Sequence, residues 1–129
     1  MARVLVVEDE PTMRELVTAR LRAAGHQIVA APDGATAVDV VTRRGAPDVV
    51  VLDIGLPDTD GYSLLASLRT AAGPATFGAV FLSGEIEESA IKRGQALGAI
   101  YLTKPFIASA LVKAIEQATA PPAADDDGW

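Results

Sequence analysis

Two unbroken runs of aliphatic residues constrain the fold of this chain more than any other feature of its sequence. The first is Arg3-Val-Leu-Val-Val7 and the second is Asp48-Val-Val-Val-Leu52. A strand with one solvent-exposed face alternates apolar and polar residues. An unbroken β-branched run is instead typical of a parallel strand that helices cover on both faces. The two runs therefore predict two central strands of a parallel sheet.

Shorter strands and helical patterns alternate along the rest of the chain. Further strands are expected at residues 27–31, 79–82 and 100–102, and helices at 11–24, 35–43, 62–70, 87–97 and around Leu111 and Ile115. In the first helix Pro11 suits the opening turn, and Met13, Leu16, Val17 and Leu21 recur at three- and four-residue steps, which predicts that they form its buried face before Gly25 ends it.

Strand followed by helix five times over predicts an α/β fold, a doubly wound five-stranded parallel sheet with five helices and right-handed crossovers. We expect the flavodoxin-like strand order 2-1-3-4-5. The chain has 129 residues, half of them hydrophobic, which suits one compact domain over residues 1–119. Residues 120–129 are rich in Pro and Asp, and we expect them to form a flexible tail or the start of a linker.

Composition excludes several classes of function. Because the chain has no cysteine, it has no disulfide, thiolate metal site or cysteine nucleophile. A formal charge of −6 argues against direct binding of nucleic acid by this domain, which depends on clustered Lys and Arg. No apolar run has the length of a membrane span, so we expect a cytoplasmic protein that does not bind membranes.

Polar side chains follow four of the expected strands. Glu8 and Asp9 come after the first strand, Asp53 after the third, Ser83 after the fourth and Lys104 after the fifth. In the expected strand order the first and third strands are neighbours, so the three carboxylates converge at one edge of the sheet. Such carboxylates repel one another unless a cation compensates, and oxygen ligands of this kind favour Mg²⁺. The ammonium of Lys104 would supply a second positive charge.

Each of these residues also has a purely structural explanation. Glu8 and Asp9 could favour the positive end of the first helix, Asp53 could be a turn residue, and Lys104 could be a solvated lysine in a loop. Their joint placement at consecutive strand ends favours a phosphate site, in which Asp53 is a covalent nucleophile, Ser83 donates a hydrogen bond and the cations stabilise the phosphoryl oxygens.

From Arg3 to about Ala118 the chain resembles the receiver domain of two-component response regulators. The resemblance rests on Val7-Glu-Asp-Glu10, Asp53-Ile-Gly-Leu-Pro-Asp-Thr-Asp-Gly61, Leu82-Ser-Gly84, Gly98-Ala99 and Tyr101-Leu-Thr-Lys-Pro-Phe106. It implies that a histidine kinase or phosphotransfer protein phosphorylates Asp53 in a Mg²⁺-dependent reaction, and that the domain then switches a surface that binds a downstream protein or effector domain. It further implies a signalling switch with self-phosphorylation and self-dephosphorylation, and it allows a phosphorylation-linked homodimer.

The same resemblance assigns roles to single residues. Asp53 resembles the phosphoacceptor, and the ligands of Mg²⁺ would be Asp9 directly, Glu8 often through water, Asp53 and the backbone carbonyl of Gly55. Ser83 resembles the hydroxyl residue that follows the phosphoryl group, Tyr101 the aromatic switch residue, and Lys104 the lysine of the motif. A cis bond is expected before Pro105.

The sequence departs from the family pattern at a few places. Glu8 and Ser83 replace the commoner Asp and Thr but keep the chemical group. The segment Gly98-Ala-Ile-Tyr101 is one residue shorter than usual, which casts doubt on the standard geometry around the fifth strand. Ile107 stands where a polar helix cap is usual, as part of either a partner surface or the packing. Glu85 could affect the lifetime of the phosphate or favour the start of the fourth helix.

Three other functions are open at this stage. A phosphatase of the haloacid-dehalogenase type also uses an Asp nucleophile with Mg²⁺, but it needs an acid where this chain has Gly55. A calcium loop through Asp58-Thr-Asp60-Gly61 would start at Leu56 and end at Ser67, which lack the required carboxylates. A receiver-like scaffold that works without phosphate remains the third, because folding does not require a working site.

Overall fold

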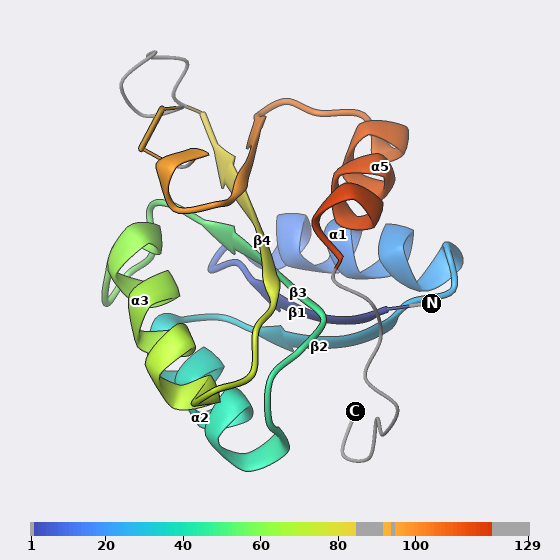
Figure 1. Cartoon of the computed structure of the whole chain (residues 1–129). Coiled ribbons are helices and arrows are strands. Elements are labelled where there is room, and N and C mark those ends of the chain that lie inside the picture. Colours follow the sequence, from blue (N-terminus) through green and yellow to red (C-terminus); the bar gives the residue numbers. More distant parts are fainter. Residues whose placement is uncertain (1, 85–91, 94, 120–129) are drawn as a thin grey trace.

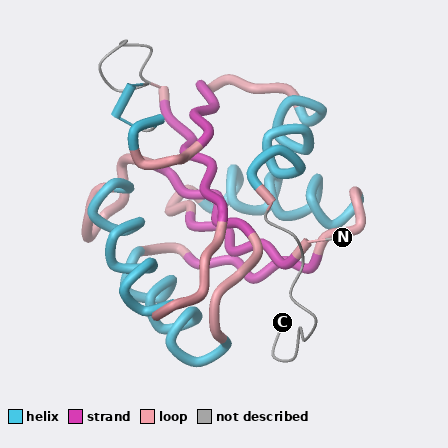
Figure 2. Tube along the Cα trace, in the orientation of Figure 1, coloured by secondary structure: helices cyan, strands magenta, loops and turns pink. Residues whose placement is uncertain are grey.

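The computed structural model describes residues 2–84, 92–93 and 95–119. The described chain folds into one five-stranded sheet with helices on both faces (Figures 1 and 2). The strands are β1 (Arg3–Val7), β2 (Gln27–Ala31), β3 (Val49–Asp53), β4 (Gly78–Ser83) and β5 (Ile100–Thr103). The helices are α1 (Pro11–Ala23), α2 (Gly34–Arg44), α3 (Gly61–Ala72) and α5 (Ala108–Ala118).

The sheet is parallel throughout and has the order β2-β1-β3-β4-β5, which confirms the predicted topology. In the register of the central strands, Val7 lies beside Leu52, and Asp53 lies beside Leu82. The carboxyl ends of β1, β3 and β4 therefore meet at one edge of the sheet, as the sequence predicted.

The unbroken aliphatic runs are explained by two separate core layers. Helices α2 and α3 cover one face of the sheet, and α1 and α5 cover the other (Figure 1). Leu5 and Leu52 pack under α2 and α3, whereas Val4 and Val51 pack under α1 and α5. All four are fully buried, so the apolar surface on both faces of the central strands is removed from contact with water.

The first three helices begin with an acidic cap. Glu10 accepts hydrogen bonds from the N–H groups of Thr12 and Met13, Asp33 caps α2, and Asp60 caps α3. These carboxylates satisfy backbone donors that have no partner within the helix. The cap position of α5 is Ile107, which makes no such side-chain bond.

Two expectations about the helices need comment. Leu16 was predicted on the buried face of α1, and this is wrong, because its side chain is 45% exposed while Val17, Thr18 and Leu21 are buried. In the helix predicted at residues 87–97, residues 92–93 and 95–96 are helical and the remainder up to 94 lies outside the described residues. Glu85 and the predicted tail at 120–129 also lie outside them.

Two further findings concern the chain as a whole. The peptide bond between Lys104 and Pro105 is cis, as the family resemblance implied. Among the helices of the described part of the chain, none combines the length and the apolar character that a membrane span requires.

Candidate functional site

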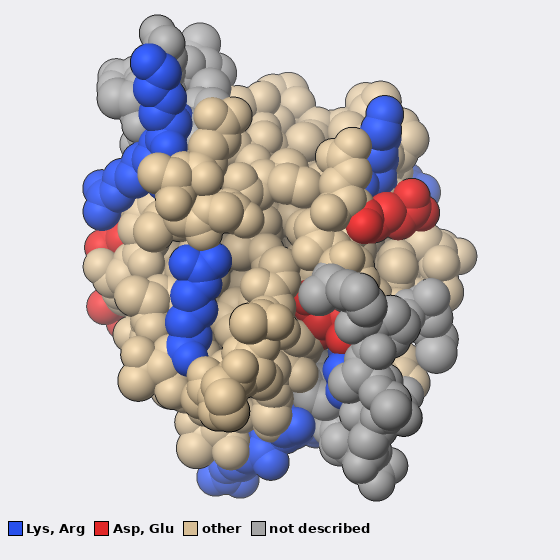
Figure 3. All heavy atoms as spheres, in the orientation of Figure 1, with Lys and Arg blue, Asp and Glu red and all other residues tan. Residues whose placement is uncertain are grey.

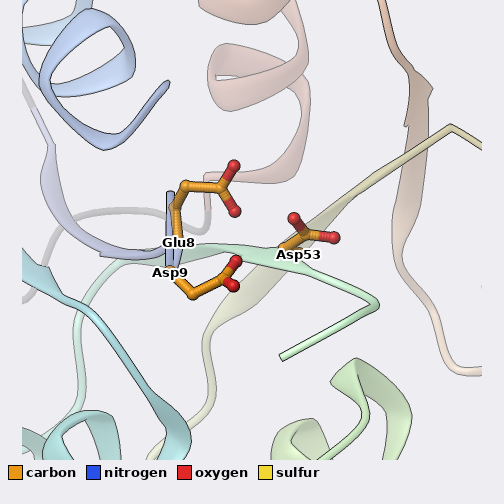
Figure 4. A group of neighbouring side chains, drawn as sticks. All are labelled: Glu8, Asp9 and Asp53. Carbon is orange, nitrogen blue, oxygen red and sulfur yellow. The ribbon is translucent and has the colours of Figure 1, made fainter. Parts of the chain in front are cut away.

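Three carboxylates meet where β1 and β3 end. Glu8 and Asp9 directly follow β1, and Asp53 is the last residue of β3. Each offers an oxygen within 4.8 Å of the others, and Figure 4 shows the three side chains turned toward a common space. Glu8 is 1% exposed, Asp53 is half-buried and Asp9 is exposed, so the group extends from the interior to the surface.

Lys104 joins this group from the loop after β5. Its Nζ lies 2.9 Å from Asp53 Oδ2 and 3.1 Å from Glu8 Oε1, so one ammonium bridges two carboxylates. The backbone N–H of Lys104 donates to the carbonyl of Ser83 at 2.7 Å, which fixes the start of this loop to the end of β4. The structure therefore brings together the four charged residues that the sequence placed at strand ends.

The close approach of these groups changes their acidity. Burial, together with a hydrogen bond and the negative charge of Asp53, raises the pKa of Glu8 to about 7. Burial opposes ionisation of Asp53, but hydrogen bonds from Glu8, Lys104 and the Gly55 N–H outweigh it and lower the pKa of Asp53. For Lys104, hydrogen bonds to both carboxylates outweigh burial and raise its pKa. Near neutral pH Asp53 is thus ionised, whereas Glu8 is still partly protonated.

The donor set suits a hard divalent cation. Three carboxylates face one lysine, so the ionised group carries more negative than positive charge. Oε2 of Glu8 is buried and has no hydrogen-bond partner among the described residues. A buried oxygen without a partner is costly, and a cation or its water ligands would satisfy it. The residues present therefore fit Mg²⁺.

The loop between β3 and α3 is held against Asp53. The N–H of Gly55 donates to Asp53 Oδ1 at 3.1 Å, while Lys104 occupies the other oxygen, so both oxygens of this carboxylate are oriented. At the end of the loop, Gly61 lies so close to Asp53 that an added Cβ would be 2.7 Å from the Asp53 carbonyl oxygen. This close approach requires glycine at the start of α3.

Ser83 lies on β4, the strand next to β3, and Tyr101 lies on β5, the edge strand beyond β4. Ser83 is 4% exposed and ends β4, one residue beyond the Leu82 that pairs with Asp53. Tyr101 lies on β5 opposite Phe81 and packs against the core on the side of α2 and α3. Ser83 thus lies one position beyond the level of Asp53 at the carboxyl end of β4, whereas Tyr101 lies one strand farther from β3.

Two nearby interactions were not found from the sequence. Arg14 Nη1 donates to the carbonyl of Glu8 at 3.0 Å and holds the turn after β1. Asp58 accepts bonds from the N–H groups of Gly34 and Ala35 at the start of α2. The contact of Arg14 could have been predicted, because a basic residue follows the acidic pair Glu8 and Asp9 by about one helix turn. The partners of Asp58 could not, because they depend on how α2 packs on α3.

The calcium-loop alternative finds no support in this geometry. Asp58 accepts bonds from the N–H groups of Gly34 and Ala35 in the first turn of α2, and Asp60 caps α3 through the N–H of Ser63. Both carboxylates are committed to separate helices and are not gathered around one centre.

Figure 3 shows the charged side chains on one face of the described residues. On the face shown in Figure 3, Lys and Arg side chains lie at separate places and do not form one continuous basic stripe.

Comparison with known proteins gives a consistent result. The family model for the response regulator receiver domain matches residues 4–116. The probable transcriptional regulatory protein TcrX of Mycobacterium tuberculosis is 42% identical over 103 residues, which cover 80% of this chain and 43% of that protein. Protein PilH of Pseudomonas aeruginosa is 34% identical over 116 residues, which cover 89% of this chain and 95% of that protein.

Solved structures share the fold. The chemotaxis protein CheY4 of Vibrio cholerae superposes with a TM-score of 0.82 at 28% identity, over 92% of this chain and 98% of that one. The receiver domain of the hybrid histidine kinase CckA superposes with a TM-score of 0.74 at 30% identity, over 90% of this chain and 97% of that one.

Proposed function

The chain belongs to the response regulator receiver family, the phosphoacceptor domains of two-component systems, and from this premise we propose that Asp53 accepts the phosphoryl group. The observation that carries the proposal is the contact of Lys104 Nζ with Asp53 Oδ2 at 2.9 Å, inside a group of three carboxylates. This arrangement keeps an ionised nucleophile beside a cation that can later neutralise phosphate.

In the proposed reaction, an oxygen of Asp53 attacks the phosphorus of a phosphohistidine in line with the breaking N–P bond, and the imidazole leaves. The hydrogen bonds from Gly55 and Lys104 hold the carboxylate in one orientation, which lowers the entropic cost of reaching the reactive geometry. Mg²⁺, held by Asp9, Asp53, the carbonyl of Gly55 and Glu8 through water, would neutralise the charge on the phosphoryl oxygens. Lys104 stabilises the same charge from the other side.

The phosphorylated site would then switch the surface around β4 and β5. Aspartyl phosphate carries roughly two negative charges where the free carboxylate carries one, and Ser83 and Lys104 are the candidates to respond to the added charge. Their link through the Ser83 carbonyl and the Lys104 N–H gives a physical connection from the site to β5, where Tyr101 lies. New contacts at Ser83 and Lys104 would bias an existing equilibrium between two surface conformations.

The partners and the outcome of the switch are also proposals. The chain spans less than half the length of TcrX but nearly all of PilH, so its relatives include both longer and equally short proteins. We propose a histidine kinase or phosphotransfer protein as the phosphodonor in the cytoplasm, and a downstream protein or effector domain, with dimerisation as one form of output. Self-phosphorylation and self-dephosphorylation would make the domain a timed switch.

The phosphate-independent scaffold is the alternative that this proposal has to exclude. We expect incubation with Mg²⁺ and acetyl phosphate to add one phosphate to the wild-type chain by intact mass, and Asp53→Asn to abolish the addition. Omission of Mg²⁺ with a chelator should also abolish it. A wild-type chain that stays unmodified, or an Asp53→Asn variant modified at the wild-type rate, would contradict the proposal. Steady release of phosphate from a small phosphate ester would instead indicate phosphatase turnover.

A further inference from the structure

The loop that carries Gly55 is fixed at its tip by a carboxylate that the proposed chemistry does not use. Asp58 Oδ1 accepts from the N–H of Gly34 at 2.9 Å, and Asp58 Oδ2 accepts from the N–H of Ala35 at 3.0 Å. The partners are 24 and 23 residues away in the chain. Asp58 therefore joins the β3–α3 loop to the first turn of α2.

The base of the same loop is closed by backbone contacts. Gly55 and Asp60 form an antiparallel bridge, and the N–H of Leu56 donates to the carbonyl of Thr59 at 3.2 Å. The loop therefore forms a small closed unit with Gly55 at its base and Asp58 near its tip. A displacement of the tip would be transmitted to Gly55, because these two contacts join the two sides of the loop on either side of Asp58.

Steric fit supports the same contact. A Cβ added at Gly34 would lie 2.7 Å from Cγ2 of Thr59 and 3.3 Å from Asp58 Oδ1. Contacts below 3 Å require something to shift, so the tip of the loop and the start of α2 are packed as closely as glycine allows. Hydrogen bonding and packing thus hold the loop tip at the same place.

The cap at Asp33 shows that the contact of Asp58 is more than ordinary helix capping. Asp33, at the cap position of α2, accepts from the N–H of Thr36 at 2.8 Å within its own segment. Both carboxylates satisfy free donors of one helix turn, but within the described part of the chain Asp33 makes no hydrogen bond to the β3–α3 loop. The two residues therefore form a matched pair for experiment.

We propose that Asp58 is a positioning residue of the phosphorylation site, which anchors the β3–α3 loop to α2 and thereby keeps Gly55 in place beside Asp53. This inference rests on the proposed function, in which the Gly55 carbonyl is a ligand of Mg²⁺. Asp58 touches neither the metal nor the phosphoryl group in this account. It acts through the loop, as outer groups that orient metal ligands do.

Magnesium affinity tests the proposal without phosphorylation. We expect Asp58→Ala to raise the Kd for Mg²⁺, measured by titration calorimetry, by roughly 10-fold, the lower end of the effect seen when groups that orient a ligand are removed. Asp58→Asn keeps one acceptor oxygen, so its Kd for Mg²⁺ should lie between those of the wild type and Asp58→Ala. Asp33→Ala, which weakens the same helix turn but leaves the loop anchored, should keep the wild-type Kd.

A second pair of variants covers the case in which Asp58→Ala does not fold. Gly34→Ala should weaken Mg²⁺ binding, because the added methyl displaces Thr59. Combining it with Thr59→Ser removes the opposing methyl and should recover the wild-type Kd. Recovery would support positioning through the loop tip; weak binding in both variants would count against it.

The outcomes separate the two proposals. A wild-type chain that does not bind Mg²⁺ contradicts the proposed function itself. A wild-type chain that binds Mg²⁺, together with an unchanged Kd in Asp58→Ala, overturns the assignment of Asp58 alone. Equal weakening in Asp58→Ala and Asp33→Ala would also overturn it, because the effect would then follow from loss of helix capping.

Discussion

The half of the site built on β1 and β3 is held far more firmly than the half that leads to β5 and α5. Every residue of β1 after Arg3 and of β3 before Asp53 is buried, whereas all four residues of β5 are half-buried. The helices near the first half start with acidic caps, while α5 starts at Ile107 without one. The two regions meet at the contact between Ser83 and Lys104.

This difference matches two different physical demands. Transfer of a phosphoryl group depends on oxygens held within a fraction of an ångström, which a fully buried pair of strands provides. A surface that reports the transfer has to change conformation, and segments with fewer buried apolar contacts open at lower free energy. In the switch proposed above, we therefore expect the half-buried strand β5, together with the uncapped start of α5, to form the movable half.

The largest expected effect comes from the same core truncation made in each region. Leu52 on β3 is fully buried, and Leu102 on β5 is half-buried. Leu52→Ala should lower the free energy of unfolding by about 3–4 kcal/mol and Leu102→Ala by about 1–2 kcal/mol, since the loss depends on the buried surface and the cavity left behind. Urea denaturation followed by circular dichroism measures both.

Leu102→Ala should also leave Mg²⁺ affinity close to that of the wild type, because Leu102 lies outside the strands that carry the carboxylates. Equal destabilisation by the two substitutions would remove the distinction between a firm and a movable half.

The firm half is also the part that the sequence predicts best. The aliphatic runs fix two central strands, and the polar residues that follow them then have to meet at one edge of the sheet. Such arguments use local pattern and topology alone. They succeed for Glu8, Asp9 and Asp53 because a buried parallel strand leaves few other places for the residue after it.

The errors and omissions arise where packing between helices decides the outcome. Leu16 fits the apolar period of α1, yet Thr18 is buried in its place, because the way α1 lies against the sheet and α5 determines which flank is covered. The bond from Asp58 to α2 likewise depends on how α2 and α3 lie side by side. A single sequence gives the period of a helix but not the angle at which its neighbours approach.

A second prediction tests the electrostatics of the firm half by pH. The pKa of Glu8 is raised from 4.5 to about 7, so the folded state keeps a proton that the unfolded state releases between these values. When a chelator keeps Mg²⁺ away, the contribution of Glu8 to the free energy of unfolding is fully present below pH 4.5 and is lost as the pH rises through 7. We expect a loss of about 2–3 kcal/mol between pH 5 and 8, which is most of the roughly 3 kcal/mol that the full shift would give.

The matched control for this prediction is Glu8→Gln. The lowered pKa of Asp53 affects stability below its usual value of 3.8, outside the window. Burial lowers the pKa of His26, which works in the opposite direction near pH 6. The free energy of unfolding of the wild type minus that of Glu8→Gln isolates the contribution of Glu8. If this difference does not change between pH 5 and 8, Glu8 ionises as it does in water.

The smallest expected effect is a gain of stability in the movable half. Ile107 is 69% exposed and caps α5 without a side-chain bond, so Ile107→Ser should add a cap while losing little buried surface. Capping of this kind is worth about 0.5–1 kcal/mol, or roughly 3 °C in melting temperature for a domain of this size. Asp33→Ser, which replaces one capping oxygen by another at the start of α2, should change the melting temperature very little. If Ile107→Ser instead lowers the melting temperature, Ile107 contributes packing that its exposure conceals, and the start of α5 is held more firmly than its missing cap implies.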